Sequence, residues 1–144
     1  MSIIEENLKK LNIILPPAPA PAANYVPYSK TGKLIFVSGQ IPIVNGEMIV
    51  GKVGKDTEVN DAVKAARACG LAIISQLKEA TNSNLDSISR IIKLGGFVNC
   101  VDSFTKQPEI INGASDLMVQ VFGEKGKHSR FAVGSNSLPR GVVV

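Results

Sequence analysis

The side chain best suited to chemistry in this sequence is that of Arg130, which begins the apolar segment Arg130-Phe-Ala-Val133. Alternate side chains of an extended segment face opposite ways, so we expect this guanidinium to face inward or into a cleft. A buried charge without a partner is costly, and the planar guanidinium fits a carboxylate through two parallel hydrogen bonds. The partner is either an acidic side chain of the protein or the carboxylate of a ligand, and the residue types favour neither.

The other polar residues have simple structural interpretations. Ser38 before Gly39 is typical of a turn, Asn112 fits the polar face of a helix, and Tyr25 fits a core. His128 is the only histidine, and its polar surroundings are typical of a solvated loop. The sequence contains neither His-x-x-x-His nor Gly-x-Ser-x-Gly, which argues against zinc enzymes and serine hydrolases.

Two further motifs bear on metals and cofactors. Cys69 and Cys100 lie in apolar surroundings, which predicts free thiols in a reducing compartment. Two cysteines and one histidine supply too few ligands for zinc, so we expect no metal. The segment from Gly46 to Lys52 lacks the Ser or Thr that completes a phosphate-binding loop, which argues against nucleotide hydrolysis. We expect no cofactor.

Composition indicates one globular domain. The chain has 144 residues, of which 44% are hydrophobic and 19% charged. The net charge of +4 is scattered along the chain and tryptophan is absent, so a nucleic-acid partner is not favoured. The N-terminus lacks a signal-peptide pattern, and no apolar run approaches the ~20 residues that cross a bilayer. The expectation is a cytoplasmic protein without a membrane partner.

The N-terminal part predicts a helix followed by an extended connector. Residues 2–11 form an amphipathic pattern that Ser2 can cap. Four prolines in residues 15–24 exclude a helix there. We therefore divide the chain into residues 1–24, a helix and a proline-rich connector that pack on the body, and a domain of residues 25–144.

The elements of that domain follow from periodicity and turn residues. Strands are expected at residues 33–37, 47–50, 89–101, 130–135 and 142–144, and helices at 58–80 and 108–122. Asn45-Gly46 predicts a type I′ hairpin, Asp56 or Thr57 is the expected cap of the first helix, and Gly95-Gly96 predicts a bulge or a close backbone approach. The resulting fold class is α+β: a sandwich of a mostly antiparallel sheet with two helices on one face.

Four features together resemble one protein family. They are Tyr25, the segment Ile35-Phe-Val-Ser-Gly-Gln-Ile-Pro42, Asn112 on a helix, and Arg130 eight residues before Leu138-Pro139. They resemble the RidA/YjgF family, also called endoribonuclease L-PSP, over residues 24–144. The N-terminal helix and residues 96–116 are similar to a less characterised subgroup.

The resemblance implies a chorismate-mutase-like fold and a homotrimer with clefts between subunits. It implies hydrolysis of reactive 2-enamines and 2-imines of the 2-aminoacrylate type to 2-keto acids and ammonia. Arg130 would hold the substrate carboxylate, Tyr25 would shape the cleft, and Ser38, Gly39 and Asn112 would line it.

Two positions bear on which groups would orient the attacking water. Ala132 occupies the position where the family often has a cysteine. The resemblance therefore implies that its backbone carbonyl orients water, because alanine has no thiol. The family also has a glutamate just beyond the position of Val144. An imine is already electrophilic, so orienting it and a water is the main task.

Two other functions are alternatives. An RNA-cleaving enzyme needs an acid and a base beside the scissile phosphate, for which His128 alone supplies little. A non-catalytic trimer, either a small-molecule binder or a chaperone-like protein, would keep Arg130 as a carboxylate ligand. Binding without ammonia release would distinguish the second alternative.

Overall fold

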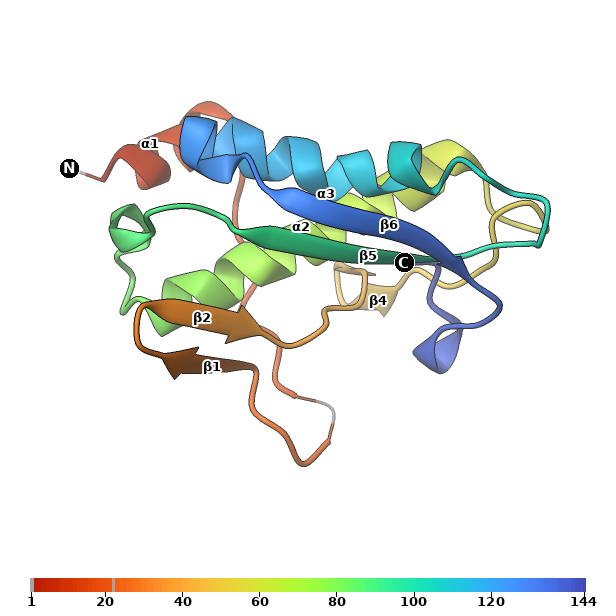
Figure 1. The fold of residues 1–144 in the computed structure, drawn as a ribbon, viewed down its shortest axis with the longest axis horizontal. Helices are drawn as coiled ribbons and strands as arrows, with labels where there is room; N and C mark the ends of the chain where they lie inside the picture. The colour runs from red at the N-terminus through yellow and green to blue at the C-terminus, as the bar shows by residue number, and fades with distance from the viewer. Residues whose placement is uncertain (1, 22) are drawn as a thin grey trace.

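Two long helices cover one face of a strand pair. The computed structural model describes residues 2–21 and 23–144. Helices α2 (Val59–Ala80) and α3 (Gln107–Phe122) lie on the same side of strands β5 (Lys93–Asn99) and β6 (Ser129–Ser135) (Figure 1). The predicted α+β sandwich with two helices on one face is confirmed. No described helix is both long enough and apolar enough to span a bilayer.

The strands of the described residues form three pairs. Strand β1 (Tyr28–Thr31) pairs antiparallel with β2 (Leu34–Val37), and β3 (Ile43–Val44) pairs antiparallel with β4 (Glu47–Met48). The longest pair, β5 with β6, is parallel. Helix α3 carries the chain back across the sheet between these two strands, and such a strand–helix–strand crossover produces parallel neighbours. Two of the three pairs therefore agree with the expected antiparallel sheet.

Turn residues behave as predicted at the β3–β4 hairpin. Asn45 and Gly46 have φ values of 51° and 81°, the positive pair that a type I′ turn requires. Strand β1 was not predicted, because its sequence Tyr-Ser-Lys-Thr has no apolar alternation. The expected strand 142–144 is absent; Val142 makes only a single bridge, to Val50.

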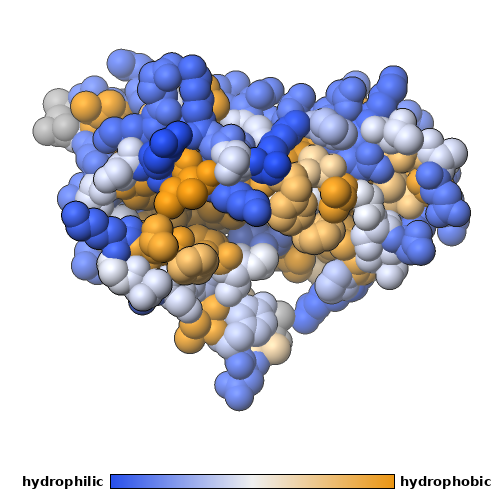
Figure 2. Space-filling view, viewed as in Figure 1, coloured by the Kyte–Doolittle hydropathy of each residue, from blue (hydrophilic) through white to orange (hydrophobic). Residues whose placement is uncertain are grey.

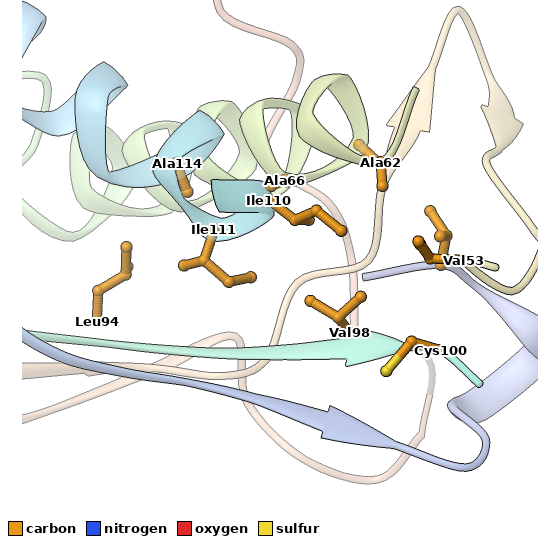
Figure 3. Close-up of a cluster of buried hydrophobic side chains, with 11 residues drawn as sticks. Val53, Ala62, Ala66, Leu94, Val98, Cys100, Ile110, Ile111 and Ala114 are labelled. Carbon is orange, nitrogen blue, oxygen red and sulfur yellow. The ribbon is translucent and has the colours of Figure 1, made fainter. Parts of the chain in front are cut away.

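The main core lies between the helices and the parallel strands, as Figure 3 shows. Helix α2 contributes mostly alanine, which lets it approach α3 closely. At Gly113 of α3 the helices lie so close that a Cβ atom would be 2.2 Å from the carbonyl oxygen of Val63. The large side chains come from the strands and α3; they include Leu94, Val98, Ile110 and Ile111.

Gly95 and Gly96 permit close packing on both faces of β5. The β5–β6 register is continuous, so there is no bulge. A Cβ atom on Gly95 would lie 2.4 Å from the ring of Phe131, and one on Gly96 would lie 2.5 Å from Cδ1 of Ile111. Of the two expected alternatives, the close approach is confirmed.

The N-terminal segment packs on this body. Helix α1 (Ile3–Lys10) buries Ile4 and Leu8 in a second core cluster. The buried polar side chains of Ser75 and Gln76 on α2 donate hydrogen bonds of 2.7 Å to carbonyl oxygens of the proline-rich connector. The connector thereby gives the buried Gln76 amide its hydrogen-bond acceptor, whereas the Ser75 hydroxyl also bonds to the Leu71 carbonyl within α2.

Helix caps differ from the prediction in two places. The N-cap of α2 is Glu58, without a side-chain cap, whereas the Asp56 carboxylate accepts the backbone N–H of Lys52. Ser2 caps α1 as expected, accepting the N–H of Glu5 at 3.2 Å. A second cap for α1 comes from Asp86, in the short 3₁₀ helix η1 (Leu85–Ser87).

Asp86 makes the attachment of α1 sensitive to acid. Its carboxylate accepts the N–H groups of Ile4 and Ile3 and the hydroxyl of Ser2, each at 2.9 Å. These bonds, that from Ile4 foremost, hold the pKa of Asp86 below its ordinary value of 3.8. A carboxyl group whose pKa is lower in the folded than in the unfolded state stabilises the protein at pH values above its unfolded-state pKa. This stabilisation is lost as the pH falls through the folded-state pKa.

We therefore expect Asp86→Asn to lower the melting temperature at neutral pH, with the difference from wild type shrinking below pH 3.8. Thermal unfolding of both proteins across this pH range is the measurement. A difference that does not change with pH would contradict the prediction.

Candidate functional site

Arg130 faces α3 from the start of β6. Strand β6 alternates, so Arg130 and Ala132 lie on its helix-facing side while Phe131 and Val133 face outward. The half-buried guanidinium donates from Nη1 to the Asn112 side-chain oxygen at 2.8 Å. The structure thus brings together two of the residues predicted for the site, one from a helix and one from a strand.

The remaining bonds of Arg130 go to neutral oxygens. Nη1 also donates to Oγ of Ser115 at 3.1 Å, and Nη2 donates to the carbonyl of Pro108 at 3.4 Å. No ion pair to Arg130 is found across residues 2–21 and 23–144; the two ion pairs there are Lys78–Glu5 and Lys127–Glu124. The charge therefore has hydrogen-bond acceptors but no acidic side chain bound to it.

His128 is part of the same cluster. Its Nε2 lies 2.9 Å from Oγ of Ser115, and its Nδ1 lies 2.6 Å from the carbonyl oxygen of Gly126. His128 lies in the loop before β6, as expected, but it is only partly exposed. Gly126 is buried against α3, so the segment before β6 packs closely on that helix.

A shallow depression opens beside these side chains, with a volume of about 260 Å³. Helix α3 supplies one wall, with residues spaced three or four apart so that they share a face. The segment leading into β6 supplies the other wall. The lining residues are Asn112, Ser115, Asp116, Val119, Lys127, His128 and Arg130.

Three predicted site residues lie in a different part of the chain. Ser38 and Gly39 directly follow β2, and the hydroxyl of Ser38 donates to the carbonyl of Val26 at 2.7 Å. This bond ties the end of β2 to the segment before β1; residues 38–40 form no turn, so the turn interpretation of Ser38 is wrong. Tyr25 is 48% exposed, which excludes a core position within one chain. These residues do not line the depression beside Arg130.

Ala132 has a structural role in the single chain. Its partly buried side chain packs against the main core and does not line the depression. Burial raises the pKa of the Cys69 thiol to about 12, and Cys100 is buried as well, so neither thiol is an available nucleophile. No group of metal-ligating side chains occurs in the described part of the chain.

Ser115 and His128 were missed as site residues, although the spacing carries a signal. Ser115 follows Asn112 by three residues, which places both on one face of α3. His128 precedes Arg130 by two residues, which places both on one side of an extended chain. Pairing these two periodicities would have grouped the four side chains.

Comparison with known proteins agrees with this architecture. Residues 5–143 match the YjgF/chorismate mutase-like endoribonuclease family. Protein TCP17 of Trypanosoma cruzi is 46% identical over 143 residues, covering 98% of this chain and 89% of that protein.

Two crystal structures are similar over almost the whole chain. That of an Agrobacterium tumefaciens protein of unknown function has a TM-score of 0.90 at 45% identity, covering 98% of this chain and 87% of that chain. That of a Shewanella oneidensis MR-1 protein has a TM-score of 0.93 at 35% identity, covering 97% of this chain and 93% of that chain. The resemblance predicted from residues is confirmed, and the chain belongs to the YjgF/chorismate mutase-like family.

Proposed function

We propose that the protein hydrolyses small 2-imino acids and their 2-enamine tautomers to 2-keto acids and ammonia. The observation that carries this proposal is the state of Arg130. Its guanidinium is half-buried, borders a depression, and is held by three neutral oxygens without an ion pair among the described residues. A substrate carboxylate supplies the ion-pair partner that Arg130 lacks among the described residues.

The surroundings of Arg130 prepare it for such a ligand. A guanidinium has five N–H donors, and the three hydrogen bonds to Asn112, Ser115 and Pro108 leave two for a carboxylate. Because its plane is fixed before binding, little side-chain entropy is lost when the ligand binds.

The chemistry requires no protein nucleophile. Water adds to the electrophilic imine carbon, and one proton moves to the nitrogen. The carbon–nitrogen bond of the resulting amino alcohol then breaks, releasing ammonia as the carbonyl forms. Holding the carboxylate on Arg130 fixes the imine carbon relative to the water, which the backbone of Ala132 orients in this proposal, and such positioning supplies much of the rate enhancement.

The active form in this proposal is a homotrimer. Outward-facing side chains of β2, β5 and β6 form an apolar outer face, defined here as Leu34, Phe36, Phe97, Phe131 and Val133. Figure 2 shows hydrophobic surface gathered over these strands. Exposed large apolar side chains gathered on one side of a protein favour an association site there. Tyr25, Ser38 and Gly39 of one subunit then complete the site around Arg130 of the next.

The direct test supplies an imino acid generated in place by an amino-acid oxidase and measures keto-acid and ammonia release. The expected result is a rate well above spontaneous hydrolysis in proportion to protein concentration. Binding of the imino acid without acceleration would exclude the enzyme and favour a small-molecule-binding trimer.

A further inference from the structure

Ser115 and His128 form a hydrogen-bonded pair that the deaminase proposal does not use. Their atoms Oγ and Nε2 are 2.9 Å apart, and Nδ1 of the same ring is 2.6 Å from the Gly126 carbonyl oxygen. A carbonyl oxygen only accepts, so Nδ1 carries the proton. In the neutral ring, Nε2 is then the acceptor, and the Ser115 hydroxyl donates to it.

A positive charge lies on the other side of the same hydroxyl. Nη1 of Arg130 donates to Oγ of Ser115 at 3.1 Å. This contact stabilises the negative charge that grows on the oxygen as its proton moves to His128. The serine therefore has a base on one side and a cation on the other, with the base oriented by a third group, which is the arrangement of an activated nucleophile.

The orientation of the imidazole is rigidly supported. Gly126 packs against α3 so closely that a Cβ atom there would lie 2.1 Å from the carbonyl oxygen of Met118. Its carbonyl, which sets the tautomer of His128, is consequently held in place by the helix that bears Ser115. The two partners of the pair are thus fixed relative to each other by the fold.

From this geometry we propose that Ser115 is an acyl-accepting nucleophile with His128 as its general base, an activity beyond imine hydrolysis. Oγ attacks the carbonyl carbon of an ester or thioester, and its proton moves to Nε2. The carbon–oxygen or carbon–sulfur bond breaks, and the leaving group takes that proton. Water, deprotonated by His128, then attacks the acyl-serine and releases the acid and free Ser115.

The depression sets the class of substrate. It is small, at about 260 Å³, and open, so it accepts a short acyl group. Arg130, which has no ion pair among the described residues, gives the lining a cation that can bind a carboxylate on the acyl group. Lys127, in contrast, is paired with Glu124, and Asp116 adds one negative charge. Val119 is the apolar side chain of the lining that an acyl group can contact. The predicted substrates are monoesters or thioesters of short dicarboxylic acids.

The test uses the full-length protein and a fluorophosphonate, which reacts with an activated serine. We expect a single label per chain, located on Ser115 by peptide mass mapping. Ser115→Ala should abolish the label, and His128→Gln should slow labelling at least about 100-fold, because a general base contributes at least that factor. Ser129→Ala is the matched control, since its exposed hydroxyl bonds only to the Ile92 carbonyl, and it should label normally.

A measurement on the wild-type protein also tests the proposal, so misfolding of a variant cannot obscure the result. A nitrophenyl monoester of succinic acid should release a burst of nitrophenol, larger than that from nitrophenyl acetate. Absence of a label on Ser115, or labelling at the same rate in folded His128→Gln, would show that the pair only links α3 to the segment before β6. Neither result depends on whether the protein hydrolyses imines.

Discussion

Replacing Arg130 with alanine is expected to lower kcat/KM for imino-acid hydrolysis at least about thirtyfold, because removing one side of a charged hydrogen-bonded pair costs roughly 2–5 kcal/mol. The substitution removes the guanidinium that is bonded to Asn112 and Ser115, so the substrate carboxylate loses its ligand. Keto-acid formation from an imine generated in place gives the rate, and light scattering confirms the oligomeric state of each sample.

The conservative variant separates charge from shape. Arg130→Lys keeps the charge but cannot make two parallel hydrogen bonds to a carboxylate, so it should remain severely impaired. Arg90→Ala removes an exposed arginine just before β5 and is the matched control, with activity close to wild type. Near-normal turnover by folded Arg130→Ala would refute the proposed mechanism and favour a binding protein.

Elements governed by local pattern were predictable from the sequence. Helix α2 begins and ends within one residue of the predicted 58–80, and α3 within one residue of 108–122. The apolar stripes of both helices span several turns, and Gly123, with φ of 63°, ends α3 as expected. The type I′ hairpin at Asn45-Gly46 was equally local, since its two residues determine the backbone twist.

Features set by distant contacts were not predictable in the same way. The N–H groups at the start of α1 are bound by Asp86, more than 80 residues away, and no capping pattern near Ser2 indicates this. The apolar run at the end of the chain predicts a strand, but Val142 and Val143 are buried between other segments and make only isolated pairing. Hydrophobicity alone does not distinguish a paired strand from a buried extended segment.

The candidate site also combines features that local pattern predicts with features that depend on distant contacts. Alternation along residues 130–133 predicted that Arg130 faces inward, and the family resemblance pointed to Asn112; the structure joins them at 2.8 Å. The sequence left open whether an acidic side chain of the protein pairs with Arg130. Among the described residues none does, because Arg130 bonds to neutral oxygens. The contact of His128 with Ser115 depends on how the chain turns at Gly126, which residue types do not reveal.

Phe131→Asp on the outer face is the second substitution with a large expected effect: it should convert the proposed trimer to monomers at micromolar concentration. Phe131 packs edge-on against Phe97, with ring centroids 5.3 Å apart, and covers Gly95 at the centre of the strand pair. Burying a large apolar side chain contributes about 1.5–3 kcal/mol, whereas burying an unpaired carboxylate costs several. The fold itself should survive, because the side chain faces away from the core.

Size exclusion with light scattering measures the dissociation, and circular dichroism confirms the fold. The control is Ile14→Asp, because Ile14 is 93% exposed on the N-terminal connector, outside the outer face, and this variant should stay trimeric. Imino-acid hydrolysis should disappear together with the trimer, since in the proposed assembly Tyr25 and Ser38 of one subunit complete the Arg130 site of the next. A monomeric wild type, or a Phe131→Asp protein that remains trimeric, would contradict an interface through this face; full activity in the monomer would show that one chain forms the whole site.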